Sequence, residues 1–320
     1  MSILDAIIQG IVQGLTEFLP VSSSGHLAIT QHITGVAGEG NLFFNVMLHV
    51  GTLVAVVAFY HKLVWSLIKE FFKMLGDIFT GKFKWREMNY ERNMIMMLII
   101  GLLPLFIMFI PIPGTDMKVK DLADVFSGSE ILLVTAFSLM LTSILLAVGA
   151  HFNRKNSANT SKHMRGQSAE GKGREAYTVA DAICVGLTQV AAALLPGLSR
   201  SGSTLAVGEM RGINKQKALD FTFILGIPSI LAAALLEGVD AIKSPEGITV
   251  EPVVILVGVL VSAIVGYLSI LLFKWFLKSD KMIVFIVYTA IVGIALLAVS
   301  VWEMMNGVNL FTNQPATLFA

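Results

Sequence analysis

The sequence predicts an all-α integral membrane protein with six transmembrane helices and two re-entrant helical hairpins, arranged as an inverted-topology repeat. Three observations support this fold class: long apolar stretches, an uneven distribution of lysine and arginine, and a similarity between two segments of the chain. Of the 320 residues, 55% are hydrophobic and only 14% are charged, whereas soluble domains contain roughly a quarter charged residues. This composition indicates a chain that lies mostly in a bilayer.

Six stretches have about the length that a membrane span requires. A spanning helix needs ~20 mostly apolar residues. The six stretches are 44–60, 94–112, 131–150, 218–238, 252–273 and 282–302. Two further apolar stretches, 3–19 and 179–195, are interrupted by polar residues and end in Leu-Pro.

The cationic residues predict the orientation. Nineteen of the 23 lysines and arginines fall in the segments 62–92, 151–178, 211–217 and 274–281, and three fall in 113–130 and 239–251. Loops rich in Lys and Arg stay in the cytoplasm. The distribution therefore predicts a multi-pass protein of the cell membrane with both termini outside, and six spans satisfy that parity.

Two segments of the chain resemble each other at an offset of 176 residues. Residues 5–23 (DAIIQGIVQGLTEFLPVSS) align without gaps to 181–199 (DAICVGLTQVAAALLPGLS). The shared residues include Asp5/Asp181, Gly10/Gly186, Gln13/Gln189, Leu19/Leu195, Pro20/Pro196 and Ser23/Ser199. One inserted residue, Arg200, then aligns Ser24-Gly25 with Ser201-Gly202. The similarity predicts a first half, 1–150, and a second half, 179–320, joined by a polar cytoplasmic linker, 151–178.

Each half contains one repeat segment followed by three spans, and an odd number of spans inverts the second copy. Residues 3–34 start outside and must be outside again before the first span, so they are expected to dip into the membrane and return. Residues 179–212 are expected to do the same from the cytoplasm. Irregular backbone at this depth requires a covering of protein or a wet cavity, so the two hairpin tips should meet at one site.

A polar stripe runs along the first hairpin. Polar side chains recur every four residues at Asp5, Gln9, Gln13 and Glu17, which places them on one slowly turning face of a helix. Gly10 and Gly14 beside this stripe predict a close approach to another helix. An ionisable group near the middle of a membrane costs several kcal/mol unless it is paired or functional, so Glu17 is a candidate functional residue.

The two tips carry the features of an anion site. The first tip, 20–26, combines serines, a glycine and His26, and the second, 196–204, combines serines, a threonine and Arg200. Hydroxyls, backbone amides and helix N-termini bind anions, and an arginine fork suits phosphate. The alternative for Arg200 is a structural ion pair with Glu17. The other N-terminal histidines are expected to be packing or interfacial residues: His32, His49 and His61.

The tip sequences G-L-T-E-F-L-P-V-S-S-S-G-H (14–26) and P-G-L-S-R-S-G-S-T (196–204) resemble the signature motifs of the undecaprenyl-diphosphate phosphatase family, also called bacitracin-resistance proteins. F-T-F-I-L-G-I-P (221–228) extends the similarity. The resemblance implies removal of the terminal phosphate from a polyprenyl diphosphate lipid, which recycles the monophosphate carrier for peptidoglycan synthesis. It also implies a site open to the outer face and a divalent cation, Mg²⁺ or Ca²⁺.

The resemblance assigns roles residue by residue. The residues matched as catalytic are Glu17, Ser23, His26 and Arg200. The residues expected to bind substrate are Gln13, Ser22, Ser24, Ser199, Ser201, Ser203 and Thr204. Gln13 departs from a pair of glutamates, so the metal is expected at Glu17 and mainly through the substrate diphosphate. The spacing from Gln189 to Pro196 is one residue longer than the family pattern.

The residues leave the nucleophile and the class of function open. Ser23 is favoured over His26 as the attacking group, with Glu17 as the base directly or through His26, and attack by water activated by Glu17 is a further alternative. A lipid-phosphate flippase or an anion transporter would share the same architecture. The expected partners are the lipid substrate and the membrane, with no nucleic acid, and a homodimer is an open alternative.

Overall fold

The described chain is helical throughout. The computed structural model describes residues 1–320 except 36–39, 85–86, 128–131, 164–172, 244–249 and 316–320. Its elements are α1 (Ile3–Phe18), α2 (Ser23–Thr34), α3 (Gly40–Phe59), α4 (His61–Phe79), α5 (Tyr90–Leu102), the 3₁₀ helix η1 (Leu103–Phe109), α6 (Asp121–Ser127), α7 (Leu133–His163), α8 (Val179–Leu194), α9 (Arg200–Met210), α10 (Lys215–Lys243), α11 (Pro252–Lys278) and α12 (Ile283–Asn306). Outside these helices, the described residues form turns, loops and a few isolated β-bridges, and none of them belongs to a β-strand. The predicted all-α class is confirmed.

The helices supply the membrane spans that hydropathy predicted. Five helical segments are long and apolar enough to cross a membrane: Tyr90–Phe109, Leu133–Lys155, Lys215–Leu236, Pro252–Lys278 and Ile283–Asn306. α3 and α4 meet the same criterion together but are bent by 85° at the break between them. α3 alone has 20 residues and accounts for the sixth predicted stretch. The chain is therefore a multi-pass membrane protein.

Two helical hairpins, one formed by α1 and α2 and the other by α8 and α9, begin with the same capping arrangement. In α1 the side chain of Ser2 accepts from the backbone of Asp5, whose carboxylate accepts from the backbone of Ser2. In α8 Thr178 and Asp181 form the same reciprocal pair. Such a capping box satisfies two of the amides that a helix leaves unpaired. The two hairpins are thus alike in local structure where their sequences are alike.

The return helices α2 and α9 also begin alike, and this corrects the register of the repeat at the tips. Ser22 caps α2 by accepting from the Gly25 amide at 3.3 Å, and Ser199 caps α9 by accepting from the Gly202 amide at 3.0 Å. The sequence alignment paired Ser23 with Ser199 and placed one inserted residue, Arg200, directly after them. The caps pair Ser22 with Ser199, so Ser23 takes the position of Arg200, while Ser24 and Gly25 stay opposite Ser201 and Gly202.

The two tips lie against each other. A Cβ added to Gly25 would lie 3.0 Å from Cα of Gly197, and a Cβ added to Gly202 would lie 3.0 Å from Cβ of Pro20. Gly197 has φ +94°, a conformation that favours glycine, and its amide donates to Ser24 Oγ at 3.5 Å. Residues far apart in sequence therefore meet at one junction.

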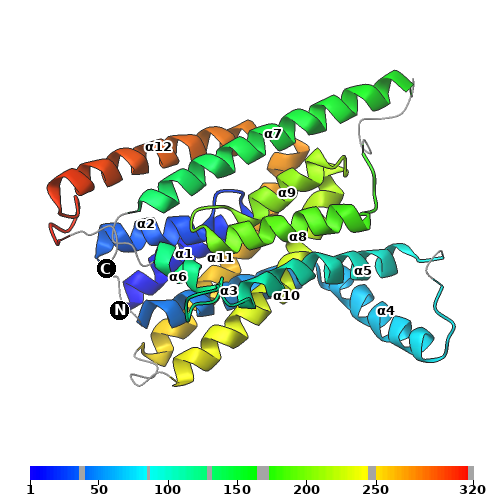
Figure 1. Ribbon diagram of the computed structural model, residues 1–320, viewed down its shortest axis with the longest axis horizontal. Coiled ribbons are helices and arrows are strands. Elements are labelled where there is room, and N and C mark those ends of the chain that lie inside the picture. Colours follow the sequence, from blue (N-terminus) through cyan, green and yellow to red (C-terminus); the bar gives the residue numbers. More distant parts are fainter. Residues whose placement is uncertain (36–39, 85–86, 128–131, 164–172, 244–249, 316–320) are drawn as a thin grey trace.

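Helix packing fixes this junction. α1 packs on α11, α8 packs on α5 and η1, and α7 packs on both α9 and α12, as Figure 1 shows for α7 and α12. A Cβ on Gly14 would lie 2.8 Å from the backbone nitrogen of Gly266, so the predicted close approach at Gly14 is confirmed. In the same way, Gly186 lies against the backbone of Gly101 in α5.

The predicted linker is partly helical. α7 continues to His163, so the expected boundary at residue 150 lies inside a helix. After the undescribed residues 164–172, Arg174 pairs through its backbone with Gly212 and Asn214 next to the second hairpin. The division into two halves around 151–178 stays a prediction.

Candidate active site

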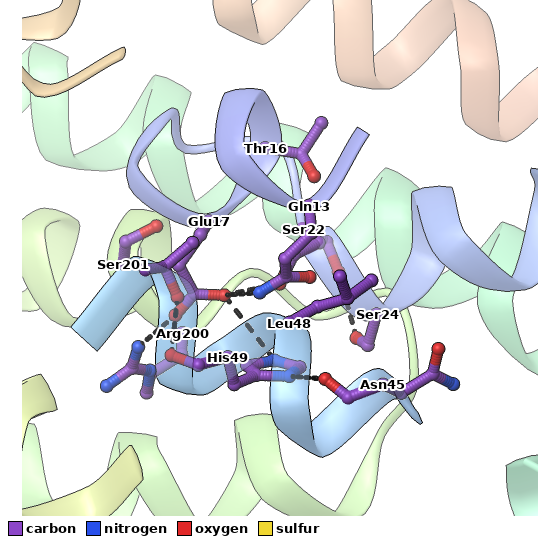
Figure 2. Close-up of polar contacts among 12 residues, drawn as sticks. Gln13, Thr16, Glu17, Ser22, Ser24, Asn45, Leu48, His49, Arg200 and Ser201 are labelled. Carbon is purple, nitrogen blue, oxygen red and sulfur yellow. Dashed lines mark hydrogen bonds and ion pairs between the residues drawn. The ribbon is translucent and has the colours of Figure 1, made fainter. Parts of the chain in front are cut away.

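A buried carboxylate, that of Glu17, lies at the junction of the two tips. Glu17 belongs to the last turn of α1, and it is 5% exposed. A carboxylate withdrawn from water in this way needs partners that compensate for its lost hydration. Figure 2 shows Gln13, Arg200 and His49 converging on it.

Four side chains from three parts of the chain contact this carboxylate. Ser23 Oγ donates to Oε2 at 2.7 Å, and Gln13 Nε2 donates to the same oxygen at 3.0 Å. Arg200 donates from Nη2 to Oε1, and His49 Nε2 lies 3.6 Å from Oε2. Charge-assisted bonds of this kind stabilise the ionised form. The arrangement aims the Ser23 hydroxyl hydrogen at a carboxylate.

Arg200 reaches Glu17 from the first residue of α9. Its guanidinium lies against α10, where Nη1 would be 2.5 Å from a Cβ at Gly226. The side chain is 26% exposed. The ion pair that the sequence left as an alternative is therefore present, but the Nη2 contact uses one of the five N–H donors of a guanidinium.

The hydroxyls of the second tip fall into two pairs. Ser199 Oγ and Ser201 Oγ lie 3.3 Å apart at the start of α9. Ser203 and Thr204 donate to the carbonyls of Ser199 and Arg200, at 2.6 and 2.7 Å. The structure thus brings all four residues to the tip, and it bonds the second pair within their own helix.

The first tip has an unusual backbone. Ser22 has φ +74°, and a non-glycine residue in this region is often found at functional sites. Its hydroxyl lies 3.3 Å from that of Ser24, and Ser24 also binds the second tip. Ser22 and Ser24 therefore tie the first tip to itself and to the second.

His26 is held by groups other than Glu17 and Ser23. Its Nδ1 lies 2.8 Å from the carbonyl oxygen of Ser22, and its Nε2 lies 2.8 Å from the hydroxyl of Tyr288 in α12. A carbonyl oxygen can only accept, so Nδ1 carries the hydrogen. The ring stacks on Tyr288 with centroids 5.6 Å apart. Tyr288 was not singled out from the sequence.

The expectation that His49 is a packing or interfacial residue was wrong. His49 lies in α3, where its Nδ1 is 2.8 Å from the carbonyl oxygen of Asn45, and this contact turns Nε2 towards Glu17. The available signal was a polar pair four residues apart, Asn45 and His49, in an otherwise apolar span. His32 lies elsewhere, where it binds the buried Glu303 at 2.8 Å.

The site offers few ligands for a metal. Among the described residues, no three His, Cys, Asp or Glu side chains are grouped so that they could hold an ion. Gln13 Oε1 is buried and without a hydrogen-bond partner in the described chain, and it belongs to the residue that binds Glu17. Hard cations prefer such oxygens, so Gln13 and Glu17 fit a cation that takes its other ligands from elsewhere.

Comparisons with known proteins agree with one another. Residues 6–295 match the family described as Bacitracin resistance protein BacA. The chain is 37% identical over 305 residues to an undecaprenyl-diphosphatase of Bacteroides fragilis strain YCH46, covering 94% of this chain and 99% of the relative. It is 38% identical over 293 residues to that of Alkaliphilus metalliredigens, covering 92% and 97%, and 35% identical over 308 residues to that of Methanosphaera stadtmanae, covering 94% and 99%.

Proposed function

This chain belongs to the bacitracin resistance protein BacA family, and from that premise we propose that the Glu17 cluster at the hairpin tips is where it hydrolyses undecaprenyl diphosphate. The protein is an undecaprenyl-diphosphatase, like the relatives that bear this name. The reaction releases inorganic phosphate and returns the monophosphate form of the lipid carrier used for cell-wall synthesis. The observation that carries the site is the contact of Ser23 and Arg200 with one buried carboxylate.

The two hairpins are re-entrant and the two halves are inverted in this proposal. The matched capping boxes and matched serine caps support a repeat. Each hairpin also packs on a helix of the other half, α1 on α11 and α8 on α5, and this symmetric packing further supports a repeat. In Figure 1 the N-terminus and the end of α12 lie at one end of the molecule, and α4 and the start of α8 lie at the other. The cation-rich end faces the cytoplasm by the positive-inside rule.

The diphosphate binds where the N-termini of α2 and α9 meet. Backbone amides at helix N-termini favour anions, and Arg200 supplies a permanent charge. Ser199 and Ser201 lie at the same point, so they are proposed as hydroxyl donors. Ser203 and Thr204 support the shape of α9, because their hydroxyls bind its own carbonyls.

Ser23 is the proposed nucleophile and Glu17 its base. As Ser23 Oγ attacks the terminal phosphorus, its proton passes to Glu17 Oε2, the bond from that phosphorus to the bridging oxygen breaks, and Glu17 gives the proton to the departing undecaprenyl monophosphate. Water then attacks the phosphoserine and gives a proton to the ionised Glu17, which returns it to Ser23 Oγ as inorganic phosphate leaves. A hydroxyl needs such a base near neutral pH. His26 orients the tip through Ser22.

Substrate binding itself can release this base. In the structure, Arg200 holds Oε1 of Glu17, and a carboxylate paired with a guanidinium accepts a proton less readily. A diphosphate carries more negative charge and competes for the same guanidinium. Because Arg200 then turns to the substrate, Glu17 becomes free to accept the Ser23 proton only when substrate is present.

A divalent cation, Mg²⁺ or Ca²⁺, is proposed to be held mainly by the diphosphate, with Gln13 Oε1 and Glu17 Oε1 as the nearest protein oxygens, so that Glu17 Oε2 stays with Ser23. When bound, such an ion neutralises charge on the phosphates and withdraws electrons from the phosphorus. The flippase and transporter alternative is not favoured, because the curated relatives are named for hydrolysis.

Phosphate release from undecaprenyl diphosphate by the purified, detergent-solubilised protein tests the proposal. Arg200→Lys keeps the charge but loses the planar fork, so we expect normal folding with turnover reduced about a hundredfold or more. Turnover by Arg200→Lys equal to that of the wild type would remove Arg200 from the site.

A further inference from the structure

α4 leaves the bundle at a steep angle and packs by one side only. It follows the spanning helix α3 after a bend of 85°, and Figure 1 shows it reaching outward beside α5. Leu67 and Met74 face the core and are buried. In the proposed six-span topology α3 crosses the membrane, so a helix bent by 85° from it runs close to the membrane plane.

The opposite side of α4 exposes a second apolar stripe. Trp65, Phe72 and Phe79 are 58%, 66% and 86% exposed. Residues seven apart on a helix share one face with little drift, and Ile68 lies beside them and is also exposed. The core-facing residues are separate from this stripe, so core packing does not explain it.

A basic strip runs along one edge of the apolar stripe. Lys62, Lys69 and Lys73 are exposed and lie within a narrow arc of the helix, by the spacing of three and four residues. Lys69 Nζ lies 5.3 Å from the Trp65 ring centroid. Lys73 Nζ approaches Glu70 only to 3.9 Å.

The acidic residues of α4 lie on its next face and share one arginine. Arg92 at the start of α5 binds Glu70 at 2.6 Å and Asp77 at 2.5 Å, and this donor lowers the pKa of the Glu70 carboxyl, since the bond favours its charged form. Arg92 thereby fixes the rotation of α4 about its axis. The three lysines outnumber the one negative charge that remains, so positive charge is in excess next to the exposed aromatic rings.

We propose that α4 is an interfacial helix that binds an anionic lipid surface: its Trp65–Phe72–Phe79 stripe enters the acyl boundary, and Lys62, Lys69 and Lys73 contact lipid phosphates. An apolar face bordered by lysines is typical of helices that lie in the membrane interface, and clustered lysines attract anionic leaflets. A second copy of the chain fits less well, because a symmetric contact on this face would place lysines against lysines.

Quenching of Trp65 fluorescence by brominated lipids tests this proposal. The reporter protein keeps Trp65 and replaces Trp85, Trp275 and Trp302 by Phe, and it is placed in nanodiscs that contain brominated phosphatidylglycerol or brominated phosphatidylcholine. The variant is Lys62→Gln with Lys73→Gln, which leaves Lys69 on the Trp65 ring. The matched control is Lys118→Gln with Lys120→Gln, distant in sequence from α4, where Lys120 also lies 3.9 Å from a carboxylate.

We expect both brominated lipids to quench Trp65, with the anionic lipid severalfold more effective at equal mole fraction. In the Lys62/Lys73 variant the two lipids should quench Trp65 about equally. In the parent, 0.5 M salt should have the same effect, because it is on the order of the concentrations that screen surface charges. The control should behave as the parent.

Absence of quenching by either lipid, or an anionic preference that the Lys62/Lys73 variant keeps in full, would overturn the proposal. Phe72→Cys in a Cys184→Ala background adds a check for the other occupant. Spontaneous disulfide-linked dimers in anionic nanodiscs would assign the stripe to a second copy, whereas labelling by a lipid-soluble thiol reagent with no dimer supports the lipid surface.

Discussion

Ser23 and Arg200 occupy equivalent positions in the two hairpins, and they bind the two different oxygens of Glu17. Each is the first residue of its return helix, directly after a serine cap. Ser23 donates to Oε2 and Arg200 to Oε1. One hairpin thus contributes a hydroxyl and the other a cation at the same structural position.

The position of Arg200 depends on a glycine in α10. A methyl group at Gly226 would lie 2.5 Å from Nη1 of Arg200, so Gly226→Ala should displace the guanidinium. A misplacement of a catalytic group by about 1 Å can cost about a hundredfold in turnover. Gly238→Ala in the same helix is the control, because a methyl group there meets open space.

Steady-state phosphate release and a thermal melt measure both variants. Alanine favours a helix interior over glycine by about 0.5–1 kcal/mol, so Gly238→Ala should be at least as stable as the parent and fully active. A Gly226→Ala protein with parental turnover would show that Arg200 tolerates the displacement.

Much of the site could be predicted because its signals are local. Spacing of four residues placed Gln13 and Glu17 on one face, and the structure joins them by a hydrogen bond. The repeat predicted that the tips would meet, and Gly25 and Gly197 lie in contact. The sequence predicted one inserted residue at the second tip but not its exact place, because serines at 22, 23 and 24 offer equally good alignments and only the cap geometry selects one.

The missed features depend on tertiary contacts. His49 sits in an apolar helix, and only the packing of α3 against the tip brings it to Glu17. The orientation of His26 depends on Tyr288, which lies 262 residues further along the chain. The bend between α3 and α4 has no proline or glycine at its break, so no local signal predicts that α4 leaves the axis of the span.

His49 should support Glu17 without taking part in bond breaking. Its Nε2 lies 3.6 Å from the carboxylate, and losing one partly buried polar partner costs about 1–2 kcal/mol, or roughly tenfold. We therefore expect His49→Ala to lower kcat about tenfold and His49→Gln to recover part of the loss. His61→Ala serves as the control, because His61 is exposed and binds the carbonyl of its near neighbour Ala58.

Kinetics of phosphate release against substrate concentration separate the outcomes for His49. A loss confined to KM would assign His49 to substrate binding. Complete inactivity of His49→Ala in a folded protein would make it a catalytic residue and would contradict the supporting role.

The proposed orientation can be read by thiol labelling in intact cells. In a Cys184→Ala background, Glu175→Cys lies in the cation-rich segment before α8, and Gln314→Cys lies after α12, and both positions are exposed. By the positive-inside rule, an impermeant maleimide should label position 314 and spare position 175 until the cells are permeabilised. The reverse pattern would contradict the orientation.

Rapid-quench trapping of a phosphorylated enzyme tests whether Ser23 attacks the phosphorus with Glu17 as its base. With undecaprenyl diphosphate labelled in the terminal phosphate, we expect a burst of protein-bound label at Ser23 by mass spectrometry. Ser23→Ala should lose this label and at least about a hundredfold of turnover, on the scale of a lost nucleophile, and still bind substrate through Arg200. Near-parental hydrolysis by Ser23→Ala together with an inactive His26→Ala would exclude Ser23 as the nucleophile and assign the attack to His26 or to water.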